Sequence, residues 1–246
     1  MSISLQLENL SVGYREVIVH DLSFSASSGE SLAVIGVNGA GKSTILKAII
    51  GEARVHAGRV YFNGTDITGY AGNVLASMGV GYVPQVRDAF PGLTVLENLR
   101  MGGYLLPRRE VASAIAEVLD RFPQLGPKRY TLAHQLSGGE RKQLGIGRAL
   151  MSKPSILLLD EPTSNLAPNL AEEVLRDISR ITSDGRCVIV VEQRVEAVLR
   201  VADRACLISN GTPQMLSDAR SVLEFIQTHG LFGQDKPSQV RSGSLL

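Results

Sequence analysis

The chain has 246 residues, of which 44% are hydrophobic and 20% charged, and its formal net charge at pH 7 is +1. This balance predicts a globular protein with one large domain, or a core domain that carries a smaller inserted one. A nearly neutral charge argues against nucleic acid as a partner and against bulk attraction to an anionic membrane. The two cysteines, Cys187 and Cys206, each lie in an apolar run, which favours buried thiols and a reducing compartment.

The first ten residues, "MSISLQLENL", alternate apolar and polar side chains and lack the basic and apolar regions of a signal peptide. They predict a β-strand. No apolar run approaches the roughly 18 residues that a membrane-spanning helix needs. If the protein works at a membrane, we expect another chain to supply the spanning helices.

Strand and helix patterns alternate along the chain. Residues 3–9 and 22–26 alternate in polarity, as half-buried antiparallel strands do. Short continuous apolar runs predict buried parallel strands at residues 31–36, 80–83, 155–160, 187–192 and 205–209. Helical periodicity occurs at residues 43–51, 110–122 and 168–182. This alternation predicts an α/β fold, a parallel sheet with helices on both faces.

The segment 86–150 interrupts that alternation, because it holds helical patterns and no convincing strand. Thr94 and Glu97 have the spacing of a capping box at the start of a helix. We therefore expect residues 86–150 to form a helical subdomain inserted between two strands of a core built from residues 1–85 and 151–232. The polar segment 233–246 is expected to be a flexible tail.

The segment "GVNGAGKST" (36–44) fits the phosphate-loop pattern G-x-x-x-x-G-K-[ST] and lies between a predicted buried strand and a predicted helix. Its glycines allow successive N–H groups to point at phosphate oxygens, and the helix adds its positive end. The predicted nucleotide-binding residues are Asn38, Gly39, Ala40, Gly41, Lys42, Ser43 and Thr44. Lys42 is expected to reach the β- and γ-phosphates, and the Ser43 hydroxyl to bind Mg²⁺. A glycine-rich turn that binds nothing would explain neither the lysine nor the hydroxyl.

Two carboxylates, Asp160 and Glu161, end the buried run "SILLLDE" (155–161). Ligands of open α/β sheets collect at the carboxyl ends of strands, so both side chains are expected near the phosphate loop. Neighbouring strand residues point to opposite sides, which predicts different roles for the two. We assign Mg²⁺, through water, to Asp160 and the activation of an attacking water to Glu161. Two acids that merely end a strand would be the alternative without the phosphate loop.

Gln85 in "YVPQ" and Gln193 in "VVEQ" lie just past buried runs, where they could sense a γ-phosphate. In isolation each could be a loop glutamine without a role. A further motif, Ser137-Gly138-Gly139-Glu140, opens a predicted helix and has the form of a second anion site.

Together these residues resemble the ATP-binding cassette family of transporter ATPases, over about residues 3–211. The motifs occur in the family's order: Tyr14, the phosphate loop, Gln85, "LSGGE" (136–140), "ILLLDE" (156–161), "SNLA" (164–167) and Gln193. The resemblance implies a phosphate-loop NTPase (RecA-like) core with an antiparallel β subdomain and an inserted helical subdomain, the ATP-binding domain spanning residues 1–232. It also implies ATP and Mg²⁺ as ligands.

The resemblance further implies roles that spacing does not give. Tyr14 is expected to stack on adenine, and Gln85 to approach Mg²⁺ and to relay to a membrane subunit. A helix N-terminus contributes only about 0.3–1 kcal/mol toward an anion, too little for Ser137, Gly138 and Gly139 to hold a nucleotide alone. In the family's head-to-tail dimer the signature of one chain closes on a nucleotide held by the phosphate loop of the other.

Two positions depart from the family pattern. The usual switch residue is histidine, whereas Gln193 cannot carry a titrating charge. The loop after Glu161 commonly ends in aspartate, whereas this chain has Ala167. We therefore expect hydrolysis to depend more on Glu161, with Gln193 orienting water or binding the γ-phosphate.

The segments "VEQ", "LAP", "FPGLTVLENLRMGGY" and "GIGRALMSKP" look like those of ATPase subunits of bacterial importers for branched-chain amino acids, amides and urea. Gln85 stands where some branched-chain amino-acid members carry glutamate, which leaves the amide and urea branch open. Implied partners are a second ATPase subunit, identical or not, two transmembrane permease subunits and, indirectly, a periplasmic binding protein. The implied location is the cytoplasmic face of the inner or plasma membrane, as a peripheral subunit.

Three alternatives stay open at this point. The cassette could serve an exporter, such as one for lipids. A soluble cassette acting on ribosomes or chromosomes is disfavoured by the single phosphate loop and by the lack of heptads or a basic patch. A binding module that does not hydrolyse ATP is disfavoured by intact Lys42, Asp160 and Glu161.

Overall fold

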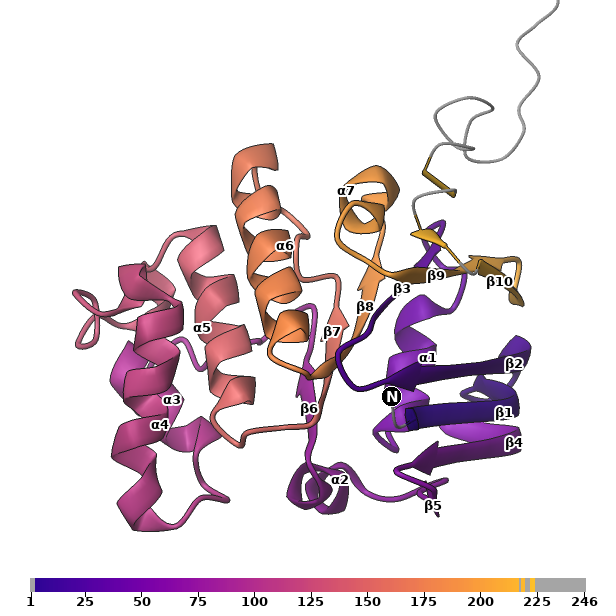
Figure 1. Ribbon diagram of the computed structural model, residues 1–246, viewed down its shortest axis with the longest axis horizontal. Coiled ribbons are helices and arrows are strands. Elements are labelled where there is room, and N and C mark those ends of the chain that lie inside the picture. Colours follow the sequence, from indigo (N-terminus) through magenta and orange to yellow (C-terminus); the bar gives the residue numbers. More distant parts are fainter. Residues whose placement is uncertain (1–2, 217, 220–221, 224–246) are drawn as a thin grey trace, which may run out of the picture.

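The computed structural model describes residues 3–216, 218–219 and 222–223. Two sheets and a group of helices lie side by side, with the helices α3, α4 and α5 at one end and the antiparallel strands at the other (Figure 1). The predicted tail 233–246 lies outside the described residues.

The central sheet has six strands in the order β10-β9-β3-β8-β7-β6. All neighbouring pairs are parallel except β9 with β10. The strand bounds are β3 Ser31–Gly36, β6 Val80–Val83, β7 Ile156–Asp160, β8 Cys187–Glu192, β9 Arg204–Ser209 and β10 Thr212–Leu216. Every residue of β3, β7 and β8 is buried, as expected for parallel strands covered on both faces.

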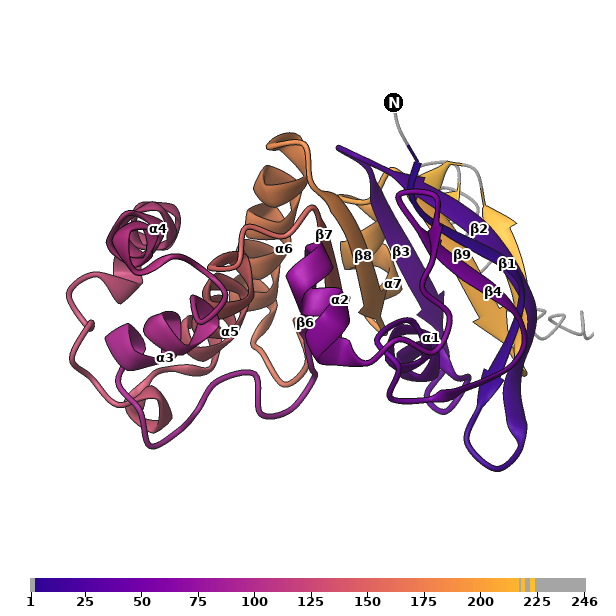
Figure 2. The ribbon, with the colours of Figure 1, turned by 90° about the horizontal axis from the view of Figure 1, so that it is seen from below.

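An antiparallel sheet with the strand order β2-β1-β4-β5 packs beside the central one. Its strands are β1 Ile3–Gly13, β2 Val17–Ser27, β4 Arg54–Phe62 and β5 Thr65–Asp66. The helix α1 (Lys42–Ile49) lies between the two sheets, in contact with β3, β1 and β4 (Figure 2). The apolar core enclosed there includes Leu46, Ile49 and Phe62.

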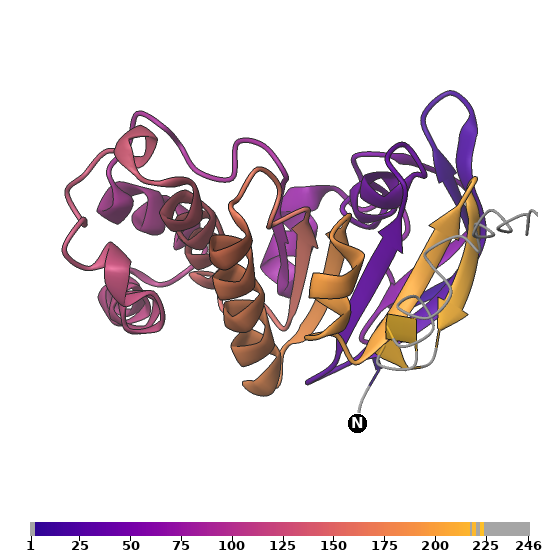
Figure 3. The same ribbon diagram turned by 90° about the horizontal axis from the view of Figure 1, so that it is seen from above.

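Helices also cover the other face of the central sheet. Helix α6 (Pro168–Ser183) packs against β8, and the short α7 (Val195–Leu199) contacts β3 (Figure 3). Helix α2 (Gly72–Met78) contacts β6 on the side of α1, where Leu75 shares the apolar core with Leu46. Pro168 occupies the first turn of α6, where its missing N–H costs nothing.

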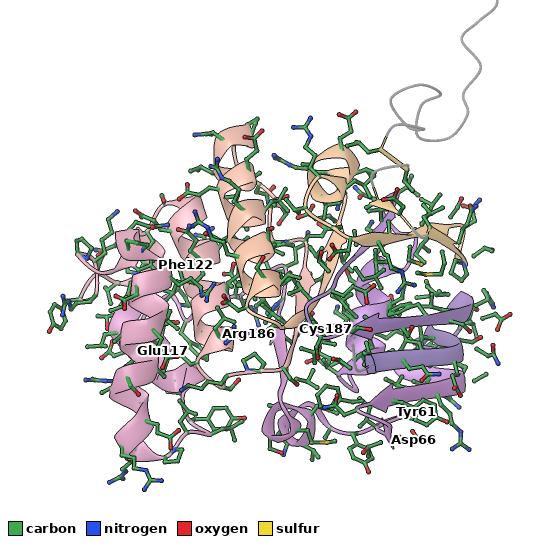
Figure 4. The ribbon with its side chains drawn as sticks, in the orientation of Figure 1. Tyr61, Asp66, Glu117, Phe122, Arg186 and Cys187 are labelled. Carbon is green, nitrogen blue, oxygen red and sulfur yellow. The ribbon has the colours of Figure 1, made fainter. Side chains whose placement is uncertain are left out.

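The segment between β6 and β7 is helical. It contains α3 (Val95–Gly102), α4 (Arg108–Arg121), α5 (Gly138–Leu150) and two short 3₁₀ turns, η1 (Pro123–Leu125) and η2 (Ala133–Gln135). Its one described strand-like feature is an isolated bridge between Thr94 and Leu132. Phe122, fully buried, ends α4 and lies in this group of helices (Figure 4). A Cβ on Gly147 of α5 would approach Cγ1 of Val118 to 2.7 Å, so α5 packs closely on α4.

The α/β fold predicted from the sequence is confirmed, including the five apolar runs that form the parallel strands. The capping box at Thr94 is also present, and the helix that it starts ends at Gly102. The domain boundaries at residues 85/86 and 150/151 stay a prediction. No described helix is long and apolar enough to cross a membrane.

Sequence patterns did not predict β4, β5, β10, α2 or α7. The strand β4, "RVHAGRVYF", is exposed over much of its length, so its polarity does not alternate regularly. Gly58 also interrupts it, at φ +81, where a Cβ would lie 2.3 Å from the carbonyl oxygens of Glu8 and Asn9. The register with β1 shifts at this point. Such an irregularity hides the period of two on which strand prediction depends.

Replacing Phe122 with Ala should lower the free energy of unfolding by about 3–5 kcal/mol, because a fully buried ring leaves a cavity between α4 and α5. Urea unfolding followed by circular dichroism measures the change. Tyr130→Ala is the control, since that ring is 75% exposed and its loss should cost less than about 0.5 kcal/mol. Equal losses for the two variants would contradict this packing.

Candidate nucleotide site

The phosphate loop connects β3 to α1. Gly41 precedes the helix with a φ of +98, which an L side chain rarely adopts. A Cβ at Gly41 would also lie 2.4 Å from Cγ2 of Val19 and 2.8 Å from Cγ2 of Ile18. Gly39, at φ +78, has no other atom within 4 Å of the place of a Cβ. The loop is therefore closely packed behind Gly41 and open at Gly39, as a cradle for a ligand requires.

Lys42 begins α1 and is only 4% exposed. Its Nζ donates to the carbonyl oxygens of Gly36 and Val37, both at 2.9 Å. Burial lowers the pKa of this ammonium, while the charges of Glu161, Asp160 and Glu192 act in the opposite direction. The Lys42 ammonium thus lines the same cavity as the Glu161 carboxylate and is held by its own loop.

Asp160, the last residue of β7, faces the start of α1. Its Oδ1 accepts a hydrogen bond from Ser43 Oγ at 2.7 Å, and its Oδ2 lies 3.5 Å from the Tyr82 hydroxyl. Burial raises the pKa of Asp160, and the Ser43 hydrogen bond opposes that rise.

A hydroxyl and a carboxylate are hard oxygen ligands, the kind that Mg²⁺ takes together with phosphate oxygens and water. In the part of the chain that the structure describes, no group of three or more His, Cys, Asp or Glu side chains could hold a metal by itself. The pair Ser43 and Asp160 therefore fits a magnesium ion that shares its coordination with a nucleotide. It does not fit a metal held by protein carboxylates alone.

Glu161 follows β7 with a φ of +47, in the left-handed region. Its two carboxylate oxygens accept hydrogen bonds from two glutamine amides, Oε2 from Gln85 Nε2 and Oε1 from Gln193 Nε2, each at 2.5 Å. Asp160 and Glu161 thus have separate partners, as their adjacent positions predicted. Strand alternation does not explain this separation, because Glu161 lies just past the end of β7 and its backbone is left-handed.

The phosphate loop, Gln85, Glu161 and Gln193 enclose one cavity of about 360 Å³. It is lined by Ile18, Asn38, Gly39, Gly41, Lys42, Ser43, Thr44, Gln85, Glu161 and Gln193. Of the residues predicted for the site, the buried Ala40 and Asp160 lie behind this lining. Tyr14 lies in the turn between β1 and β2, is 48% exposed and does not belong to the lining. Ile18, on the strand after that turn, was not predicted as a site residue, because it belongs to no motif that the sequence shows.

The second anion motif lies elsewhere. Ser137 caps α5: its Oγ accepts from the Glu140 N–H at 3.3 Å, and Glu140 Oε2 accepts from the Ser137 N–H at 3.0 Å. Burial raises the pKa of Glu140, but hydrogen bonds from Lys128 and Ser137 lower it further than burial raises it. Ser137 and Gly139 line a separate hollow of about 220 Å³ with Gln124, Gln143 and Glu173. A single chain therefore does not bring its two anion motifs together.

Two further groups around the cavity were missed from the sequence. Lys142 Nζ, on α5, donates to the carbonyl oxygen of Gln85 at 2.8 Å and lies 3.1 Å from the Asp88 carboxylate. Glu192 is buried beside Gln193, and burial raises its pKa although hydrogen bonds from Thr163 oppose the rise. The sequence did not reveal them because a charged residue in a helical pattern, such as Lys142, or at a strand end, such as Glu192, is usually expected to face solvent.

Comparisons with known proteins agree with this geometry. Residues 19–164 match the family model described as "ABC transporter". The probable branched-chain amino acid transport ATP-binding protein LivF of Archaeoglobus fulgidus is 38% identical over 222 residues, 89% of this chain and 94% of that protein. The lipopolysaccharide export system ATP-binding protein LptB of Haemophilus influenzae is 34% identical over 235 residues, 90% and 95% of the two chains.

A solved structure supports the same assignment. The ADP conformation of MJ1267, an ATP-binding cassette of an ABC transporter, superposes with a TM-score of 0.80 at 29% identity, over 91% of this chain and 96% of that one. Fold, cavity and relatives agree over nearly the whole chain. The chain therefore belongs to the ABC transporter family and is an ATP-hydrolysing, ATP-binding subunit of a transport system.

Proposed function

We propose that this ATPase energises a membrane importer for branched-chain amino acids, amides or urea, and that Glu161 is its general base. The observation that carries the assignment of the base is the Glu161 carboxylate, held between the amides of Gln85 and Gln193 in the cavity that contains Lys42. No other carboxylate lines that cavity among the described residues. The likeness to a branched-chain amino acid transport protein supports the importer assignment.

In this proposal each group of the cavity has one task. Lys42 turns from the loop carbonyls to the β- and γ-phosphates, and Ser43 and Asp160 hold Mg²⁺, which neutralises phosphate charge. Glu161 takes a proton from water, whose oxygen attacks the γ-phosphorus. The bond from that phosphorus to the bridging oxygen breaks, giving ADP and phosphate. Gln193 orients the water without titrating.

The proposed site is completed by a second chain. Ser137 and Gly139 do not line the cavity of their own chain and instead line a different hollow. The N-terminus of α5, with Gly138 and Gly139 in its first turn, is suited to bind the γ-phosphate of a nucleotide held by the facing subunit. Tyr14 is proposed to stack on adenine, since its exposed ring lies at the tip of the hairpin that also carries Ile18.

The proposed contact with the permease subunits is a groove beside α3. It has a volume of about 420 Å³, and its lining includes Tyr82, Phe90, Met101, Tyr104, Leu105 and Arg148. Tyr104 and Met101 are 65% and 51% exposed. Its lining includes residues on both sides of Gln85 in the chain, Tyr82 before it and Phe90 after it, so we expect closure at the nucleotide to move the groove. In the complex, this chain would lie at the cytoplasmic face of the inner or plasma membrane, beneath two transmembrane permease subunits that receive solute from a periplasmic binding protein.

An export function is the second candidate, supported by the 34% identity to a lipopolysaccharide export protein. Uptake of radiolabelled leucine, acetamide and urea into cells with and without the gene separates the two functions. The importer proposal expects a loss of uptake of at least one of these solutes, restored by the wild-type gene. Unchanged uptake of all three would contradict it.

Replacing Lys42 with Ala should weaken binding of MgATP about 30-fold or more, because loss of one partner from a desolvated charge contact costs about 2–5 kcal/mol. Titration calorimetry on the full chain measures the affinity. Arg109→Ala removes an equal charge from an exposed position in α4 and should bind as wild type does. An unchanged affinity in Lys42→Ala would refute the phosphate-loop assignment.

Replacing Glu161 with Gln should lower kcat about 10²- to 10⁴-fold, the usual contribution of a general base. ATP binding should persist, and the nucleotide-bound dimer should accumulate in light-scattering measurements because it no longer turns over. Glu117→Gln, the same change on the outer face of α4, should keep wild-type kcat. Rapid turnover by Glu161→Gln would exclude it as the base.

Two inactive variants should restore each other if the site is shared between identical chains. Ser137→Arg keeps the phosphate loop but blocks the exposed start of α5, while Lys42→Ala keeps that helix start intact. A mixed dimer contains one complete site, so equal mixing should recover ATPase activity well above either variant alone. Full activity of Ser137→Arg as a monomer would refute the shared site.

A further inference from the structure

Three consecutive residues at the end of β8 each bond to the segment that follows β7. Glu192 binds Thr163, Gln193 binds Glu161, and Arg194 binds Leu166. The Gln193 contact belongs to the proposed catalytic arrangement. Neither Thr163 nor Leu166, the partners in the other two contacts, lines the cavity.

The buried Glu192 carboxylate accepts hydrogen bonds from this segment. Its Oε1 accepts both the N–H of Thr163, at 2.8 Å, and the Thr163 hydroxyl, at 2.7 Å. Its Oε2 accepts the N–H of Gln193 at 3.1 Å. Glu192 is 2% exposed and Thr163 is fully buried. Hydrogen bonds to a charged acceptor in such surroundings are roughly twice as strong as neutral ones.

Arg194 holds the other end of the same segment. Its Nη2 donates to the carbonyl oxygen of Leu166 at 2.5 Å. The Leu166 side chain is buried, and a Cβ on Gly138 would lie 3.0 Å from its Cδ2. The segment after β7 therefore runs from the base of the cavity to the start of α5. At its end Ala167 caps α6 without any side-chain hydrogen bond.

Glu161 needs such support, because its backbone is left-handed. A residue other than glycine in that region stores about 1–3 kcal/mol and persists only when its surroundings fix it. The Glu161 N–H donates to the Val191 carbonyl oxygen at 2.9 Å. The backbone of Glu161, the buried Thr163 and the carbonyl of Leu166 are thus all tied to residues 191–194.

We propose that Glu192 and Arg194 are positioning residues, which hold the segment 161–167 and thereby set the place of the Glu161 carboxylate. Neither residue lines the cavity, and both act through Glu161 and Gln193. The proposal rests on the role proposed above for Glu161 as the base. Ala167, at the end of the segment, has no side chain that could cap α6, and Arg194 binds the neighbouring carbonyl of Leu166.

The test uses Glu192→Gln, Thr163→Val and Arg194→Met in the full chain. Glutamine at position 192 keeps one acceptor oxygen for Thr163 but points an amide N–H at the N–H of Gln193. Thr163→Val removes the hydroxyl at equal size, and Thr163→Ser keeps it. Amide hydrogen exchange of a peptide covering residues 161–167 and the steady-state kcat and KM for ATP are measured for each.

The control is Asp203→Asn. Asp203 Oδ2 accepts hydrogen bonds from the N–H and the hydroxyl of Ser31, each at 2.8 Å, as Glu192 Oε1 does from Thr163. Ser31 lies at the start of β3, whereas the cavity lies beyond the end of that strand. Asp203→Asn should speed exchange near Ser31 alone and leave kcat unchanged.

We expect faster exchange at 161–167 and a kcat lowered about 10-fold or more in the three variants, with KM within about twofold, since a displacement near 1 Å can cost 100-fold. Thr163→Ser should keep kcat within about twofold of wild type. In a Glu161→Gln background, Glu192→Gln should cause no further loss. Wild-type exchange at 161–167 in Glu192→Gln, or faster exchange with unchanged kcat, would overturn the positioning role. Wild-type kcat in Glu161→Gln would instead overturn the assignment of Glu161 as the base. The exchange data would still show whether Glu192 and Arg194 hold the segment 161–167.

Discussion

The arrangement of the site depends on the parallel order β3-β8-β7-β6, because parallel strands bring their carboxyl ends to one edge of a sheet. Four places far apart in the sequence meet at that edge: the phosphate loop after β3, Gln85 after β6, Glu161 after β7 and Gln193 after β8. The hydrogen bonds that join Gln85 and Gln193 to Glu161 are possible only in this order.

Burial of charge is the second constraint on the site. Lys42, Asp160, Glu161 and Glu192 are all nearly inaccessible to water, and a buried charge without partners costs several kcal/mol. The hydrogen bonds described for each carboxylate, and the loop carbonyls around Lys42, offset that cost. The same contacts fix the side chains in position, so the site is prepared for a charged ligand before one arrives.

Lys142 extends this network from the cavity to the helical segment. Lying on α5, it joins the carbonyl of Gln85 to the Asp88 carboxylate. Leu166 reaches the start of the same helix from the other side, against Gly138. Helix α5 therefore contacts both Gln85, which bonds to Glu161, and the segment 161–167, which contains Glu161, although its own N-terminus does not line the cavity. These contacts connect the surroundings of Glu161 to helix α5.

The sequence alone determined the elements whose cause is local: the buried strands, the loop from Gly36 to Thr44, the capping box at Thr94 and the helix start at Ser137. Each depends on residues only a few positions apart. Only the tertiary structure decided that two glutamines flank Glu161, that Glu192 grips Thr163, and that Tyr14 lies outside the cavity lining. These contacts follow from the strand order and from the left-handed backbone at Glu161. Neither feature produces a periodic pattern in the sequence from which it could be predicted.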